Sequence, residues 1–109
     1  MTRLYTEQET IAVIDDLTAP RLTGFVRARV VVPVGSDQGD LYREVDLARL
    51  RLLCDLEQDY RLDDEALALV MSLLDQLNAA RADMRALLAA LAAQPPETRK
   101  SLRAALSGQ

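Results

Sequence analysis

The stretch EALALVMSLLDQLNAARADMRALLAALAAQ, residues 65–94, decides the fold of this chain. It contains no Gly and no Pro, and good helix formers such as Leu, Ala, Arg and Met dominate it. We therefore expect one helix of roughly 30 residues, about 45 Å long at 1.5 Å per residue. Apolar residues recur along it at alternating intervals of three and four, the a/d spacing of a two-helix seam. The seam positions are Leu67, Val70, Leu74, Leu77, Arg81, Met84, Leu88 and Leu91.

This seam needs a cover that the rest of the chain does not supply. Pro95 and Pro96 end the helix, and the short helix or tail expected after them, over 97–106, cannot cover eight seam positions. We therefore predict that a second copy covers the seam, in a parallel or antiparallel pair. Arg81 is the one polar seam residue, and it either sets the register at a cost in stability or extends its guanidinium out of the seam.

The composition fits a mainly helical protein that interacts with other proteins. Half of the 109 residues are hydrophobic but only 4% are aromatic, and such a core is most easily built from helices. The net charge of -4 and the pI of about 4.7 argue against binding to nucleic acid, which requires a basic surface.

The single cysteine, Cys54, lies in an apolar helical pattern and has no partner for an internal disulfide. The chain has no His to activate this thiol, so we expect a buried, inert side chain. The N-terminus lacks a signal-peptide pattern, and no apolar run approaches the roughly 20 residues of a membrane span. We therefore expect a cytoplasmic protein that does not enter a membrane.

Residues 1–62 are expected to form a small head. Thr6 and Glu9 fit a capping box that begins a first helix, and Thr18 caps a second helix over 21–28, with Pro20 in its first turn. Two helices joined by so short a connection predict a helix-turn-helix.

A small two-stranded wing is expected to follow. The β-branched run 30–32 predicts one strand, residues 35–40 have the composition of a turn, and 41–43 predict the returning strand. A third helix is expected over 46–59. The predicted organisation is therefore a mainly α head, a long helix over 63–94 and a short helix or tail over 95–109.

This order resembles the MerR-type winged helix-turn-helix family. The matching segments are Leu4-Tyr5-Thr6, Ala19-Pro20-Arg21-Leu22, Leu41-Tyr42-Arg43-Glu44-Val45-Asp46-Leu47 and Tyr60-Arg61-Leu62-Asp63-Asp64-Glu65. The resemblance implies a winged head followed by a long dimerisation helix. MerR-type regulators carry cations in the wing, whereas the wing turn here carries Asp37 and Asp40, which repel phosphate.

A short, acidic, MerR-like chain with a helical dimerisation segment is similar to the CbpM-type chaperone modulators. That resemblance implies a protein with no catalytic centre and no cofactor. Members of the family bind the J-domain of a DnaJ-like co-chaperone called CbpA, block its stimulation of the Hsp70 partner and weaken its DNA binding. A J-domain presents a basic helix, which an acidic competitor complements.

Asp37, Asp40 and Tyr42 are the candidate partner-binding residues. Each also has a structural interpretation, because the two carboxylates are common turn residues and a tyrosine wedges well between a wing and helices. The alternative function is a small dimeric MerR-like transcription regulator, with Arg21 and its neighbours on phosphates.

The acidic pairs and runs of the head are not expected to form a metal or catalytic site. The sequence has no His, one Cys and no EF-hand spacing, so solvated helix faces and helix-end charges explain these carboxylates. The residues concerned are Asp15, Asp16, Asp55, Glu57 and Asp59.

Overall fold

The computed structural model describes residues 2–108, and these are mainly helical with a small antiparallel sheet. The chain divides into two compact units, one ending at Ser72 and the other beginning at Leu73. The first two turns of the long helix therefore belong to the same unit as the head. None of the described helices is long and apolar enough to cross a bilayer.

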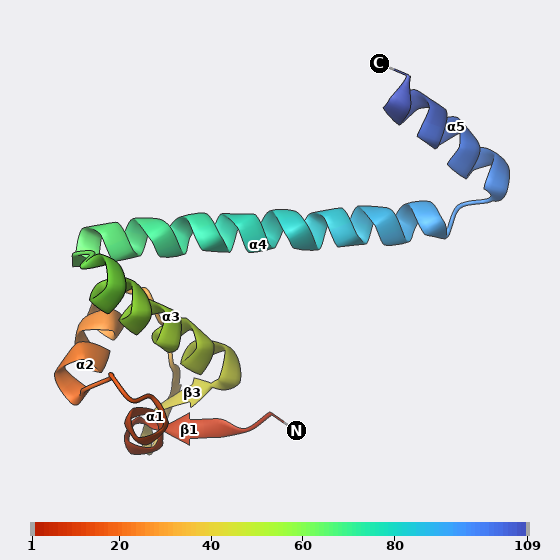
Figure 1. Cartoon of the computed structure of the whole chain (residues 1–109). Helices are drawn as coiled ribbons and strands as arrows, with labels where there is room; N and C mark the ends of the chain where they lie inside the picture. Colours follow the sequence, from red (N-terminus) through yellow and green to blue (C-terminus); the bar gives the residue numbers. More distant parts are fainter. Residues whose placement is uncertain (1, 109) are drawn as a thin grey trace. The chain divides into compact units, whose positions relative to one another are not determined.

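The sheet has three strands, in the order β1-β3-β2. Figure 1 labels two of them, β1 and β3, which pair with each other. The strands are β1 (Leu4–Thr6), β2 (Val34–Ser36) and β3 (Gly39–Arg43). Tyr5 pairs with Tyr42 across β1 and β3. The hairpin between β2 and β3 returns through Gly39, whose φ of 105° favours a residue without a Cβ.

The predicted two-stranded wing is wrong in two respects. The strand expected at 30–32 begins only at Val34, after Pro33, and β1 adds a third strand that was not expected. The backbone of Val30 is already used, because its N–H donates to the carbonyl of Phe25 and its own carbonyl accepts from Arg49. These two hydrogen bonds leave neither group for a ladder.

Helices α1 (Glu7–Val13) and α2 (Ala19–Arg27) begin directly after their predicted caps, although α2 starts two residues before the predicted 21. The Thr6 hydroxyl accepts from the Glu9 N–H at 3.1 Å, and the Glu9 carboxylate accepts from the Thr6 N–H at 3.0 Å, which confirms the capping box. Thr18 caps α2 by accepting from the N–H of Arg21 at 3.3 Å.

Helix α3 (Glu44–Tyr60) provides the centre of the head core. Its residues Leu47, Leu50, Leu53 and Cys54 are at most 4% exposed, as the apolar spacing predicted. The other large core side chains come from every neighbouring element and include Tyr42, Leu22, Phe25, Val31, Leu67 and Met71.

The long helix predicted over 63–94 is confirmed as α4 (Asp64–Ala92), and α5 (Pro96–Ser107) follows it. The side chain of Asp63 caps α4 by accepting from the N–H of Ala66 at 2.9 Å. Pro96 occupies the first position of α5, where its missing N–H costs nothing. The two helices therefore begin and end where capping residues and prolines dictate.

Candidate functional site

The β2–β3 hairpin exposes two carboxylates, one in its turn and one in β3, and buries a tyrosine of β3. Asp37 and Asp40 are exposed, whereas Tyr42 is 1% exposed and belongs to the core. Burial, together with the charge of Asp40, raises the pKa of Tyr42 to about 12. The assignment of Tyr42 to partner binding is therefore wrong, because its side chain is inaccessible.

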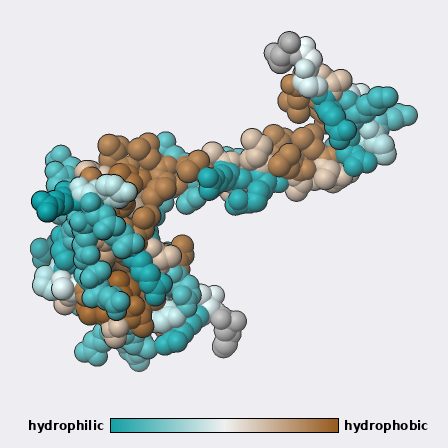
Figure 2. Space-filling view, viewed as in Figure 1, coloured by the Kyte–Doolittle hydropathy of each residue, from teal (hydrophilic) through white to brown (hydrophobic). Residues whose placement is uncertain are grey.

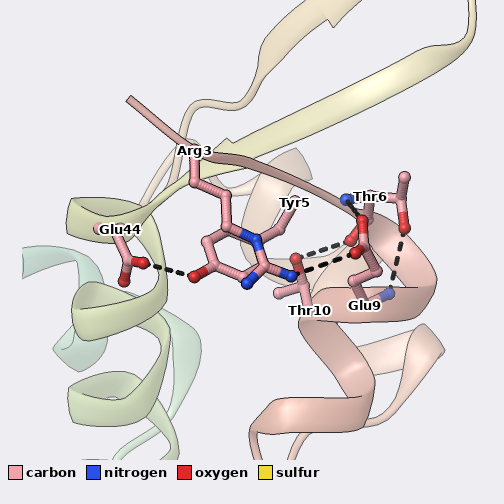
Figure 3. Close-up of polar contacts among 6 residues, drawn as sticks. All are labelled: Arg3, Tyr5, Thr6, Glu9, Thr10 and Glu44. Atoms are coloured by element: carbon pink, nitrogen blue, oxygen red, sulfur yellow. Dashed lines mark hydrogen bonds and ion pairs between the residues drawn. The ribbon is translucent and has the colours of Figure 1, made fainter. Parts of the chain in front are cut away.

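A polar network ties β1 to α1 and α3, and it holds the edge of the sheet in place (Figure 3). The Tyr5 hydroxyl donates to the Glu44 carboxylate, which raises the pKa of Tyr5. Arg3 lies over the Tyr5 ring at 4.4 Å from the centroid and pairs with Glu9 at 3.4 Å. Hydrogen bonds from Thr6 lower the pKa of Glu9.

The first cation of α2 is held by carboxylates of its own chain. Arg21 donates through Nε to Glu57 at 3.1 Å and pairs through Nη2 with both Glu57 and Asp64. Its guanidinium also lies 4.5 Å from the centroid of the Phe25 ring. Because two carboxylates surround it, Arg21 links α2 to α3 and α4 and offers little positive potential to a phosphate.

The charge of a second arginine, Arg43, is balanced by a carboxylate at the start of α3. It donates Nε and Nη2 to the two oxygens of Asp46, each at 3.0 Å, and its backbone N–H also donates to that carboxylate. Asp46 is 2% exposed. The bidentate pair raises the pKa of Arg43 and fixes the junction between β3 and α3.

An open hollow of about 200 Å³ lies between the end of α1 and α3. Its lining is mostly polar, because three exposed carboxylates and one exposed arginine line it beside the buried Ile14 and Cys54. The lining residues are Val13, Ile14, Asp15, Asp16, Arg51, Cys54 and Asp55. Burial and the nearby carboxylates raise the pKa of the Cys54 thiol, which disfavours the reactive thiolate.

The two units carry opposite charge. The first 72 residues contain eight arginines and fourteen carboxylates, whereas the remaining residues contain five cations and three carboxylates. The first unit is thus strongly acidic and the second weakly basic. Since Arg21 and Arg43 are paired with carboxylates of the first unit, part of its small cationic complement is already compensated.

The predicted dimer seam falls into three parts. Leu67 is 1% exposed and is buried in the first unit, which corrects its assignment to a dimer interface. Val70, Leu74 and Leu91 are half-buried. The remaining four positions, Leu77, Arg81, Met84 and Leu88, are exposed.

Sequence reasoning missed part of the exposed apolar surface of α4. Leu69, Leu73 and Leu87 are all more than half exposed, and none belongs to the predicted seam. At 3.6 residues per turn, a strict heptad drifts around a straight helix by about 20° per heptad, so the continuous apolar surface follows other positions. We define the apolar face of α4 as Leu69, Leu73, Leu77, Ala80, Met84, Leu87, Leu88 and Leu91, which lie within an arc of about 100°.

The end of α4 and the helix α5 enclose an apolar groove. Figure 1 shows α5 turning back after α4, and in Figure 2 apolar atoms gather on both helices. The groove has a volume of about 440 Å³. Its lining residues, which define the α4–α5 groove, are Leu88, Leu91, Ala92, Arg99, Leu102, Arg103, Leu106 and Ser107.

Among residues 2–108, no group of three or more His, Cys, Asp or Glu side chains is placed to hold a metal ion. Comparisons with protein-family models, curated proteins and solved structures found no match to this chain.

Proposed function

We propose that this chain is a non-enzymatic, homodimeric adaptor of the cytoplasm that binds and inhibits the J-domain of a DnaJ-like co-chaperone. In this proposal the first unit is a MerR-like winged helix-turn-helix head of the CbpM type, with α1 and α2 as the helix pair and the β2–β3 hairpin as the wing. Occlusion is the proposed mechanism, because one basic J-domain surface cannot contact this head and Hsp70 at the same time.

The acidity of the head is the observation that carries the proposal. This unit contains fourteen carboxylates and eight arginines, and Asp37 in the hairpin turn and Asp40 in β3 are both exposed. Complementary potentials accelerate encounter and select the partner, so a basic helix is favoured over neutral or acidic surfaces. The hollow lined by Asp15, Asp16 and Asp55 adds a second acidic surface in the same unit.

The alternative, a DNA-binding regulator, has less support. Its phosphate contacts would come from α2 and the hairpin, yet Arg21 is paired with Glu57 and Asp64 and the hairpin turn carries carboxylates. Arg27 and Arg29 are exposed, and they are the cations near α2 that could contact phosphates in a DNA complex. A surface with so few cations predicts weak binding to a polyanion.

The apolar face of α4 supports the homodimer. Leu73, Met84, Leu87 and Leu88 are each 54–56% exposed on one side of a 29-residue helix. An exposed apolar stripe of this length is typical of an interaction site and is costly to leave in water. A second copy presents the same stripe, so two copies cover each other.

Calorimetric titration of the full chain with a purified J-domain tests the function. We expect a complex with a dissociation constant in the micromolar range or tighter that weakens as salt is added. The double variant Asp37→Asn with Asp40→Asn and the double variant Asp15→Asn with Asp16→Asn identify which acidic surface makes the contact. Glu97→Gln, in the second unit, is the matched control that should bind normally.

Two results would decide against the proposal. Absence of heat and of co-elution at tens of micromolar would remove J-domain binding. Tight, sequence-selective retardation of DNA fragments in a gel would instead favour the regulator, provided that the affinity falls steeply with salt.

A further inference from the structure

The α4–α5 groove lies within the second unit and combines apolar side chains from two helices. Leu88 and Leu91 line it from α4, and Leu102 and Leu106 line it from α5. Leu88 is 56% exposed and Leu106 is 68% exposed, so the groove leaves leucine side chains in water. A molecule with an apolar part that covers these leucines removes that area from water, which is favourable.

Two arginines line the groove beside these leucines. Arg99 and Arg103 lie one turn apart on α5, and both are exposed. Among residues 2–108, no carboxylate pairs with either guanidinium, in contrast to Arg21 and Arg43 of the first unit. The two charges are therefore open to an anionic group, and a guanidinium binds a carboxylate well because it can donate two parallel hydrogen bonds to it.

The size of the groove favours a small ligand over a protein partner. Its eight lining residues are far fewer than the roughly 20–30 residues that each partner contributes to a stable protein interface. Its volume of about 440 Å³ lies within the roughly 300–1,000 Å³ of small-molecule pockets. Such pockets are mostly apolar and hold a few polar groups that orient the ligand, as the leucines and arginines do here.

The concave form of the groove favours a free molecule over a membrane surface. Leucines from two helices line one hollow, whereas a helix that lies on a bilayer presents its apolar side chains along one outward face. A single alkyl chain can enter such a hollow and keep its charged end at the arginines. The chain then covers the leucines, and the anion balances the two cations.

We propose that the α4–α5 groove binds a free single-chain amphiphile with an anionic head, such as a fatty-acid carboxylate. The alkyl chain lies against Leu88, Leu91 and Leu102, and the carboxylate pairs with Arg99 and Arg103. This binding site goes beyond the proposed function, because neither the J-domain contact nor the homodimer requires it. Leu88 and Leu91 also belong to the apolar face of α4, so the oligomeric state is measured alongside ligand binding.

Calorimetric titration of the full chain with dodecanoate, below its critical micelle concentration, tests the proposal. We expect one ligand per chain and a dissociation constant in the micromolar range. Dodecyltrimethylammonium has the same alkyl chain with a cationic head, and it should bind at least about tenfold more weakly. Butanoate keeps the carboxylate but has a short chain, and it should bind at least about 100-fold more weakly.

Two variants and a matched control assign the binding to this groove. Arg99→Gln combined with Arg103→Gln should weaken dodecanoate binding at least about tenfold and remove most of the preference over the cationic amphiphile. Leu102→Gln, which introduces another good helix former, should weaken both amphiphiles by about five- to tenfold. Lys100→Gln removes a cation of the same helix outside the groove lining and should change the affinity by less than about twofold. Circular dichroism checks that each variant remains helical.

Three results would overturn the proposal. The first is no binding of dodecanoate at millimolar concentration. The second is equal affinity for the anionic and cationic amphiphiles, or equal weakening by Lys100→Gln and by the double arginine variant, since either result means non-specific adsorption. The third is co-sedimentation with phosphatidylglycerol vesicles without binding of free dodecanoate, which would assign these side chains to a membrane surface.

Failure of this site and failure of the proposed function are distinguishable. Sedimentation equilibrium without ligand measures the homodimer, and titration with the J-domain measures partner binding. A monomer that binds dodecanoate as described would contradict the homodimer and support the groove. A dimer that binds the J-domain but not dodecanoate would contradict the groove alone.

Discussion

The two units of this molecule differ in how much of their leucine side chains they bury. In the first unit, Leu50 and Leu53 are fully buried by neighbouring helices and the sheet. In the second, Leu87 and Leu106 are 54% and 68% exposed although their helices are equally regular. Regular backbone hydrogen bonding thus forms in both units, but within one chain only the first completes a core.

This difference assigns different roles to the two units. The first unit buries a core of its own and carries an excess of carboxylates, although some of its apolar side chains, such as Val45 and Tyr60, stay exposed. The second has a large apolar surface with few internal contacts to stabilise it, which is the property of a segment that folds against another surface. Changes in the first unit should act on folding, and changes in the second on assembly.

The largest expected effect comes from truncation of the head core. Leu50→Ala should lower the free energy of unfolding by about 2–5 kcal/mol, because it leaves a cavity at a fully buried site. Leu87→Ala should change it by less than about 0.5 kcal/mol when measured on dilute protein. Urea unfolding measures the free energy of unfolding of both variants. An equal decrease in the two would contradict the difference between the units.

A charge on the apolar face of α4 should break assembly without unfolding the head. Leu77→Glu is expected to raise the dimer dissociation constant at least about 100-fold, because a carboxylate would be buried against apolar side chains. Ala82→Glu, on the opposite side of the same helix, should leave it within about threefold. Light scattering over a dilution series measures both constants, and a dimer that tolerates Leu77→Glu would place the interface elsewhere.

Loss of the buried carboxylate at the start of α3 should destabilise the head moderately. Asp46→Ala removes three hydrogen bonds from Arg43 and should cost about 1–3 kcal/mol in thermal or urea unfolding. The exposed Asp59→Ala is the control and should be close to neutral. A neutral Asp46→Ala would mean that the junction between the sheet and α3 is held by packing alone.

Alkaline pH should lower the free energy of unfolding of the first unit, because Tyr42 is harder to ionise in the folded chain than in the unfolded chain. The folded pKa is about 12 against an ordinary value of 10.0, so above pH 10 the unfolded chain loses this proton first and gains stability relative to the fold. The loss should be on the order of 1 kcal/mol near pH 11. Tyr42→Phe should flatten the dependence of unfolding on pH in this range, and an unchanged slope would refute the role of Tyr42.

The smallest effect is expected at the first helix cap. Thr6→Ala removes the hydroxyl that accepts from the Glu9 N–H and should lower stability by about 1 kcal/mol, whereas Thr6→Ser should retain most of it. Differential scanning calorimetry compares the two variants. Equal melting temperatures would show that the packing of β1 holds this helix start without the cap.

Local chemistry in the sequence predicted the helix boundaries well. Thr6, Thr18 and Asp63 each cap a helix through the hydrogen bond expected of its side chain, and Pro96 begins α5. A cap depends on residues within one turn of it, so the pattern is readable without the tertiary fold.

Tertiary structure overrode the expectations for three residues. Val30 has the β-branched side chain of a strand residue, but the end of α2 and Arg49 take both of its backbone groups. Leu67 fits a heptad as well as Leu74 does, yet the first unit buries it. Tyr42 lies beside an exposed turn but points into the core. None of these three outcomes follows from the local sequence pattern alone.

Sedimentation equilibrium of the unmodified chain tests the central claim most directly, namely that a second copy covers the apolar face of α4. The account predicts a species of twice the 12.1 kDa chain mass at micromolar concentration, with dissociation on dilution. A folded, helical species that keeps the mass of one chain at tens of micromolar would contradict it.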